Sequence, residues 1–304
     1  MPASEIELVV GPEGGFTETE LTALLQTGFE PLWQRSALCG CGRANIDSGA
    51  YLLATDKRTR VAQRYDIMRV GIDLLDEGQI APAIEQLVAK DEPTQIVLAR
   101  WWDFMRARRR RSYRECLSEA DLVLPVSRSL VVAASALRGV RLPRYMPFDF
   151  VIRALGGLEA RSRSLFVLGG SPKTIRVVEQ NLRETFPGIR FVGRHTGRFR
   201  KQREADIITA IRKAHPDFVL IGPGVRSRDR WVFRHRGRLS PSIFLCSPEV
   251  FDIFADRRRR GSRTAFKRGL DFVPDLFRRP WRVLRFFAFV WFLVVLGLSR
   301  LFRR

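Results

Sequence analysis

The sequence predicts an α/β protein whose largely parallel sheet is flanked by helices. From residue 68 onward, short apolar runs alternate with segments that have the period of a helix. The runs are apolar throughout, as in strands that are buried on both faces of a parallel sheet. Several of them end on glycine or proline and open directly into a helical segment, which is the strand–helix order of a Rossmann-like sheet.

The expected elements follow one another along the chain. Strands are expected at 95–99, 121–124, 164–168, 189–193, 217–221 and 242–246. Helices are expected at 82–90, 102–119, 127–138, 148–158, 172–186, 203–215, 225–238 and 248–257. A strand also begins at Met68, in Met68-Arg-Val-Gly-Ile-Asp, and Arg108–Arg111 is expected to be a solvated charged run.

Residues 1–67 form a different piece. A strand from Ile6 leads into the glycine loop Gly11-Pro-Glu-Gly-Gly-Phe, and Thr17 with Glu20 forms a capping box for a helix that ends near Gly28. This stretch resembles the C-terminal tail of the SPOUT-class 16S rRNA uridine methyltransferases. Because most of such a domain would lie upstream, we expect a remnant of a neighbouring gene fused in frame, or a misassigned start.

The C-terminal segment 257–304 combines charge with an apolar stretch. It holds 14 lysine and arginine residues against two aspartates, and Phe286–Leu298 is 13 apolar residues long. A helix of that length rises about 20 Å, less than a hydrocarbon layer of about 30 Å. A buried core helix is one interpretation, but arginines at both ends together with Phe and Trp favour a helix in the membrane interface or a short span.

The composition indicates which ligands and which compartment suit this protein. The net charge is +21 and almost all of it comes from arginine, which suits phosphate groups and anionic lipid surfaces. The four cysteines and three histidines show no metal-ligand spacing, so we expect neither a metal nor a cofactor. Reduced cysteines and the lack of a signal-peptide pattern fit a cytoplasmic protein.

A family resemblance rests on five fragments between Ala120 and Phe272. They are Ala120-Asp-Leu-Val-Leu-Pro125, Leu165-Phe-Val-Leu-Gly-Gly170, Val192-Gly193 with Gly197 and Phe199, Gly222-Pro-Gly224 with Trp231, and Phe251-Asp252. In this order they resemble the WecB/TagA/CpsF glycosyltransferases (glycosyltransferase family 26), which move N-acetylmannosamine or a similar sugar onto a lipid-linked acceptor. This resemblance implies a glycosyltransferase-like domain at 68–256 and a membrane-associating appendage at 257–304, which follow the methyltransferase-like tail at 1–67.

The resemblance also implies a set of substrate-binding residues. Glycine turns after buried strands let a backbone approach phosphate, and arginines pair with a diphosphate. Arg228 replaces a glutamine of the family, and either pairs with phosphate or lies exposed on a basic helix. Arg257 and Arg260 either pair with the diphosphate or belong to a solvated turn of four arginines. The implied residues are Gly169, Gly170, Gly222, Gly224, Arg228, Asp229, Trp231, Arg257 and Arg260.

The catalytic positions depart from the family pattern. Val126 stands where the family has the aspartate of Leu-Pro-Asp-Gly, and valine cannot accept a proton from an acceptor hydroxyl. The family's Thr-x-Asn has no counterpart within 97–101, and Asp275 reverses the charge of a family arginine. Asp149, which matches the aspartate of the family's Gly-Ile-Asp, is the predicted catalytic residue, and Asp103 is the alternative base.

We therefore expect a transferase that moves N-acetylmannosamine or another N-acetylhexosamine from a UDP-sugar to a polyprenyl-diphosphate-linked or other lipid acceptor in cell-envelope polysaccharide synthesis. It would act at the cytoplasmic face of the inner membrane, held peripherally or monotopically on anionic lipid by its C-terminal segment, and self-association is common for such units. A catalytically inactive member that keeps nucleotide-sugar or lipid binding is the alternative. An RNA-binding protein or methyltransferase remnant fits less well, because aromatic residues do not interleave with the basic ones, and nucleic acid is not an expected partner.

Overall fold

The computed structural model describes strands at 8–10, 29–31 and 52–55 and the segments 61–67, 70–139 and 142–268. The chain divides into two compact units between Arg60 and Val61. In the first unit, β1 (Leu8–Val10), β3 (Leu52–Thr55) and β2 (Phe29–Pro31) form an antiparallel sheet in that order. The predicted glycine loop at 11–16 and the helix that follows it lie outside the described residues.

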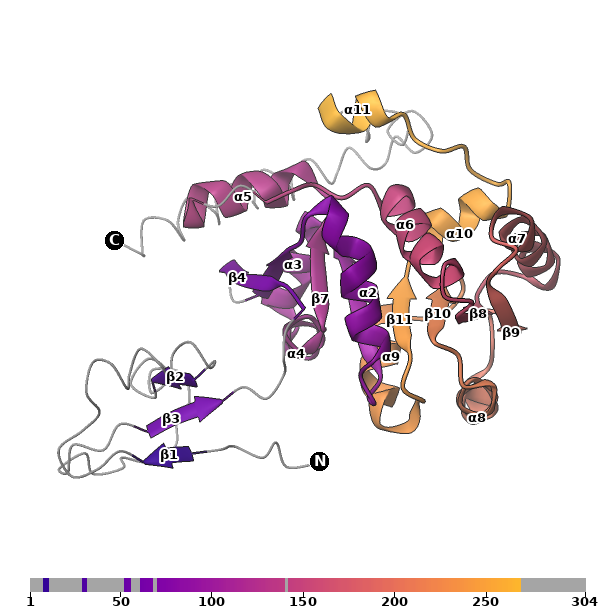
Figure 1. Cartoon of the computed structure of the whole chain (residues 1–304), viewed down its shortest axis with the longest axis horizontal. Coiled ribbons are helices and arrows are strands. Elements are labelled where there is room, and N and C mark those ends of the chain that lie inside the picture. Colours follow the sequence, from indigo (N-terminus) through magenta and orange to yellow (C-terminus); the bar gives the residue numbers. More distant parts are fainter. Residues whose placement is uncertain are drawn as a thin grey trace. The chain divides into compact units, whose positions relative to one another are not determined.

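The centre of the second unit is a parallel sheet of six strands, which confirms the predicted α/β class (Figure 1). The side chains of its central strands are buried on both faces. The order across the sheet is β7 (Leu122–Pro125), β6 (Thr94–Ala99), β11 (Ile243–Cys246), β10 (Phe218–Ile221), β8 (Ser164–Leu168) and β9 (Arg190–His195).

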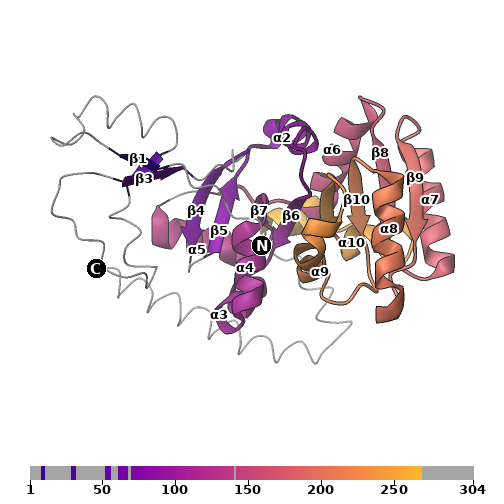
Figure 2. The same ribbon diagram turned by 90° about the horizontal axis from the view of Figure 1, so that it is seen from below.

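Helices cover both faces of this sheet, as the two views show (Figures 1 and 2). The apolar sides of α2 (Ile80–Val88), α6 (Pro147–Glu159), α7 (Pro172–Thr185) and α10 (Pro248–Phe254) form one core with one face. On the other face lie α3 (Trp101–Arg109), α4 (Arg111–Glu119), α8 (Glu204–Ala214) and α9 (Arg228–His235). The helix α5 (Arg128–Arg138) packs on β4 and β7 and shares the apolar core of α3 and α4, and α11 (Arg263–Arg268) follows α10 in the chain.

A hairpin of β4 (Gln63–Ile67) and β5 (Val70–Leu74) packs beside β7. Its buried anchor is Asp73, whose two oxygens accept hydrogen bonds from Arg64 at 2.6 and 2.7 Å and from the Val123 N–H at 2.5 Å. The strand β4 belongs to this unit, although the sequence analysis assigned residues up to 67 to the methyltransferase-like tail. The identity predicted for the first unit stays a prediction.

Most helix bounds shift by one to three residues, and two helices differ most from their prediction. The helix expected at 102–119 is two helices, because Arg110 between them has the extended backbone angles φ −130° and ψ 109°. The exposed arginine run that the sequence places at this point is the junction. The helix expected from residue 225 begins at Arg228, because Gly224 and Ser227 have positive φ and keep the loop non-helical.

No helix within the described residues is long and apolar enough to cross a membrane. The segment Phe286–Leu298, on which the predicted membrane association depends, lies outside the described residues.

Candidate functional site

The carboxyl ends of the parallel strands meet at one edge of the sheet, where the predicted glycine loops lie. The connection after β8 leads to β9 on one side, whereas the connection after β10 leads to β11 on the other side. In open α/β sheets, ligands bind outside the strand ends where the chain turns away in opposite directions. The loops after β8 and β10 are therefore the starting point for the site.

These glycine loops interlock with each other. The N–H groups of Gly169, Gly170 and Gly222 donate to the carbonyls of His195, Pro223 and Leu168 at 2.9, 2.7 and 2.8 Å. A β-carbon on Gly169 would lie 2.7 Å from the Gly222 α-carbon. Glycine is thus required because two backbones touch. Three of the four predicted phosphate-binding glycines already use their N–H groups within the protein, whereas Gly224 is exposed, with φ 105°.

Charged side chains from several elements gather next to these loops. Glu249 on α10 pairs with Arg100 at the end of β6 and, at 3.4 Å, with Arg258. Four charged side chains interact electrostatically with Asp252. Three are positive and one, Glu249, is negative; the positive ones are Arg228, Arg257 and Arg258. Burial raises the pKa of Asp252 and these arginines oppose the rise. The cluster has more guanidinium groups than carboxylates, so it can accept further negative charge.

A cavity of about 350 Å³ adjoins the start of α6. Asp149 in the first turn of α6 accepts hydrogen bonds from Arg260 at 2.5 Å and from Arg263 at 2.9 Å. Arg144 donates to the Val126 carbonyl at 2.7 Å and to the Phe266 carbonyl at 2.5 Å, and its guanidinium lies 3.7 Å from the Phe266 ring centroid. The residues that line this cavity are Ile80, Arg144, Tyr145, Met146, Asp149, Phe150, Arg153, Arg263 and Phe266.

The chain that follows α10 closes one side of this cavity, and its contacts with Arg144 and Asp149 hold it there. Arg144, which lines this cavity together with Asp149, also bonds the carbonyl of Val126 directly after β7. The structure therefore brings together Asp149 and Arg260, which the sequence analysis predicted, and adds Arg144 and Arg263, which it did not predict. Arg144 carried no signal beyond its charge.

Trp231 lies in the core below the edge of the sheet. Its side chain is 2 % exposed, its indole N–H donates to Glu204 at 2.5 Å, and its ring meets Phe199 edge-on. A buried indole with a satisfied N–H has no free face for a nucleotide. Trp231 instead packs α9, the helix that begins at Arg228, onto the core.

A buried polar cluster connects α3, α4 and α9 beneath the sheet. The Tyr113 hydroxyl donates to Asp103 at 2.9 Å, and the Cys246 thiol hydrogen-bonds the Asp229 carboxylate. Burial raises the pKa of Asp103 to about 6 and also raises the pKa of Asp229. Asp229, predicted to contact substrate, thus lies in a cluster with a second carboxylate. No sequence signal predicted this pairing, because Asp103 and Asp229 are far apart in the chain.

This cluster makes stability depend on pH. Burial raises the pKa of Asp103 from 3.8 to about 6, so between these values the folded state holds more protons at this residue. The contribution of Asp103 to the free energy of unfolding therefore falls as pH rises through this window, by roughly 3 kcal/mol, and stays lower above it. We expect Asp103→Asn, which cannot ionise, to remove this fall. Urea unfolding of both proteins between pH 4 and about 7 measures the difference, and parallel pH curves would contradict it.

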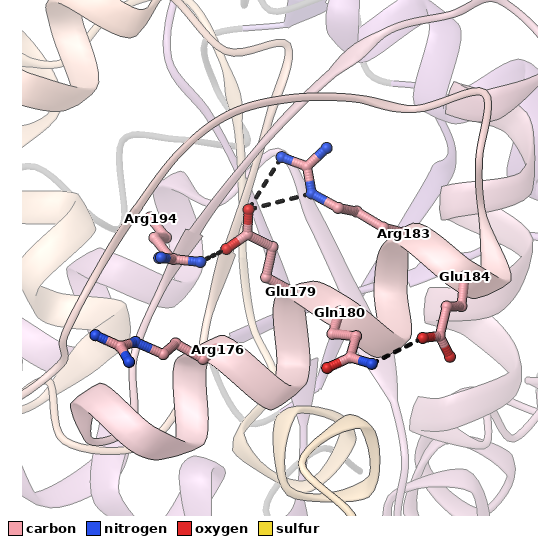
Figure 3. Close-up of a pocket in the computed structure, with 6 residues that line it drawn as sticks. All are labelled: Arg176, Glu179, Gln180, Arg183, Glu184 and Arg194. Atoms are coloured by element: carbon pink, nitrogen blue, oxygen red, sulfur yellow. Dashed lines mark hydrogen bonds and ion pairs between the residues drawn. The ribbon is translucent and has the colours of Figure 1, made fainter.

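A second depression lies on the outer side of α7 and β9 (Figure 3). It measures about 420 Å³ and is open to solvent. Glu179 at the centre of the depression pairs with Arg183, at 3.0 Å, and with Arg194. Carboxylates therefore already neutralise most of the positive charge of the depression. None of the glycine loops lines it, and it is not a candidate site. Among the described residues, no group of three potential metal ligands occurs.

Comparison with known proteins identifies the family of the chain. The profile of the glycosyl transferase WecG/TagA/CpsF family matches residues 65–304. The chain belongs to this glycosyltransferase family. No individual curated protein matches it. The match begins inside β4, so it covers most of the β4–β5 hairpin and Asp73, whereas Arg64 directly precedes it.

Family membership confirms the resemblance drawn from the motifs, and glycosyl transfer is the general activity of the family. The roles of individual residues stay predictions. At the position implied for the general base of a WecG/TagA/CpsF enzyme, Val126 is 4 % exposed and its carbonyl accepts the Arg144 hydrogen bond. Arg144 also lines the cavity next to α6. The carboxylate in the lining of that cavity is Asp149, which two guanidinium groups already contact.

Proposed function

We propose that this protein transfers an N-acetylhexosamine, such as N-acetylmannosamine, from a UDP-sugar to a lipid-linked acceptor in cell-envelope polysaccharide synthesis. The observation that carries the proposal is the excess of arginine at the carboxyl edge of the sheet, beside a cavity that contains a carboxylate. The leaving group of such a reaction is a nucleoside diphosphate. Arg228, Arg257 and Arg258 are suited to offset its charge without a metal ion.

Asp149 is the proposed proton acceptor. In the reaction, the bond between the anomeric carbon and the diphosphate oxygen breaks, the acceptor oxygen bonds to that carbon, and the hydroxyl proton moves to a carboxylate. Both oxygens of Asp149 are hydrogen-bonded to arginines, at 2.5 and 2.9 Å. A donor diphosphate that draws Arg260 away would free one oxygen for the acceptor hydroxyl. Arg260 would then serve both the leaving group and the base.

The alternative is a member of the family that binds nucleotide sugar or lipid without turnover. The observation that favours it is the environment of Val126, where an apolar side chain is buried and the neighbouring arginine is bonded to its carbonyl. In this case the arginine-rich edge would still bind the diphosphate, and no proton would be transferred.

We expect the full chain in detergent to release UDP from UDP-N-acetylhexosamines when a polyprenyl-diphosphate sugar is supplied. General acid–base catalysis contributes about a hundredfold or more, so Asp149→Asn should lower kcat by at least that factor. Asp149→Glu, which keeps a carboxylate, should retain part of the activity. Gly156→Ala, on the same helix but with open space around its α-carbon, should leave kcat unchanged.

Two outcomes would decide against the catalytic proposal. Full activity of Asp149→Asn would exclude Asp149 as the base. Binding of UDP without turnover, together with turnover in Val126→Asp, would show that the chain has lost its base and acts by binding.

A further inference from the structure

The two helical layers of the second unit carry opposite net charge. The helices α3, α4 and α9 contain eight arginines and four acidic residues, whereas α2, α6, α7 and α10 contain four basic and seven acidic residues. The remaining helix of the first layer, α8, has two of each sign. Such a distribution gives the molecule a preferred orientation toward an anionic surface.

The positive charge is densest where α3 meets α4. Five arginines within six residues are exposed there, and α4 packs on α9, which adds the exposed Arg234. Arg111 pairs with Glu115, and Arg106 lies 3.9 Å from the largely buried Asp103. Within the described part of the chain, no carboxylate pairs with the other four arginines of this group. We call the exposed group the arginine face: Arg106, Arg108, Arg109, Arg110, Arg111 and Arg234.

Tryptophan accompanies this charge. Trp102, Arg106 and Arg109 follow at the spacing that places side chains on one side of a helix, and the Arg100 guanidinium lies 5.1 Å from a Trp102 ring centroid. Trp101 meets Trp102 edge-on, and both are half-buried. Tryptophan next to arginine is typical of protein surfaces that enter the headgroup region of a bilayer. Nucleic-acid grooves instead carry a row of aromatic platforms, and here there is one pair at one end.

We propose that the arginine face docks on an anionic lipid bilayer. This inference rests on the proposed function in one respect, because a lipid-linked acceptor would place the substrate in a membrane. The helices α3 and α9 begin at the carboxyl ends of β6 and β10, next to Arg100 and Arg228. The arginine face lies toward the other ends of these helices, and α3 is nine residues or about 13 Å long, so docking would hold the arginine-rich edge of the sheet within about that distance of the lipid headgroups. This surface is separate from the C-terminal segment to which the sequence analysis assigned membrane association.

The test is flotation of the full chain with phosphatidylcholine vesicles, with and without phosphatidylglycerol. The test variant reverses three charges: Arg108→Glu, Arg109→Glu and Arg110→Glu. The matched control makes the same change of net charge on α7, in the opposite layer: Lys173→Glu, Arg176→Glu and Arg183→Glu. Each basic residue at an anionic surface contributes about 1 kcal/mol, so the test variant should partition into anionic vesicles on the order of a hundredfold less well.

We expect the control variant to bind within about threefold of the native protein, and added salt to weaken native binding. Equal loss in both variants, or no binding of the native protein to anionic vesicles, would overturn the proposal. Loss of binding to a structured RNA in the test variant, without vesicle binding by the native protein, would assign the face to nucleic acid. UDP release in detergent separates this proposal from the catalytic one: the test variant should keep native turnover even though vesicle binding is lost.

Discussion

Asp73→Ala should lower the free energy of unfolding by about 3–5 kcal/mol, the effect of breaking a buried ion pair by removing one partner. Asp73 is 1 % exposed and holds Arg64 and the Val123 N–H together. Without it, the mostly buried Arg64 keeps, among the described residues, the carbonyls of Ser118 and Ala120 as partners. The loss is a large part of the total stability of an ordinary domain. Urea unfolding of the full chain, followed by circular dichroism, measures it.

The control for this prediction is an exposed ion pair. Glu115→Ala removes the partner of Arg111, whose side chain is 85 % exposed, and should change stability by less than about 1 kcal/mol. An apolar replacement of both buried partners, Arg64→Met with Asp73→Leu, should recover part of the loss. If Asp73→Ala costs no more than Glu115→Ala, the hairpin does not anchor the domain, and the unit would begin after it.

The second large effect is expected for Gly169→Ala. The added β-carbon would lie 2.7 Å from the α-carbon and 2.9 Å from the nitrogen of Gly222, and backbone cannot turn aside as a side chain can. Overpacking of this kind costs about 1–3 kcal/mol and sometimes more. The loops after β8 and β10 must then separate. We therefore expect both a lower melting temperature and a weaker affinity for UDP, measured by calorimetry.

A matched control exists on α6. At Gly156 a β-carbon meets nothing within 4 Å, so Gly156→Ala should stabilise the protein by about 0.5–1 kcal/mol and leave UDP affinity unchanged. Native stability and native UDP affinity in Gly169→Ala would show that the loops are free to move apart, which would contradict the close contact described above.

Much of the fold was predictable because the chain repeats one local pattern. The strand predicted at 164–168 was confirmed over the same residues, and Ser171-Pro172 correctly marked the start of α7, where Ser171 accepts the Thr174 N–H at 3.2 Å. The predictions failed where local signals conflict with packing. The run of helix formers through Arg110 suggested one helix, but α4 folds back to pack against α3 and the backbone is extended between them.

The candidate site was predictable only in part. The motifs that carry the family resemblance predicted Arg257, Arg260 and the loops after β8 and β10, and the binding roles of these residues stay predictions. The motifs gave no indication that Asp149 is held by two arginines, that Trp231 is buried, or that Asp103 and Asp229 share one cluster. Each of these facts concerns the partner of a side chain, and partners come from other elements.

The sequence by itself therefore determined the α/β class, the order of strands and helices, and the family, since these depend on hydrophobic period and on short motifs within single segments. Only the tertiary structure decided the order of strands across the sheet, the membership of β4 in the second unit, the mutual packing of the glycine loops and the opposite charge of the two helical layers. The physical reason is that burial and charge at a residue depend on which distant segments fold against it, and periodicity along the chain carries no record of those neighbours.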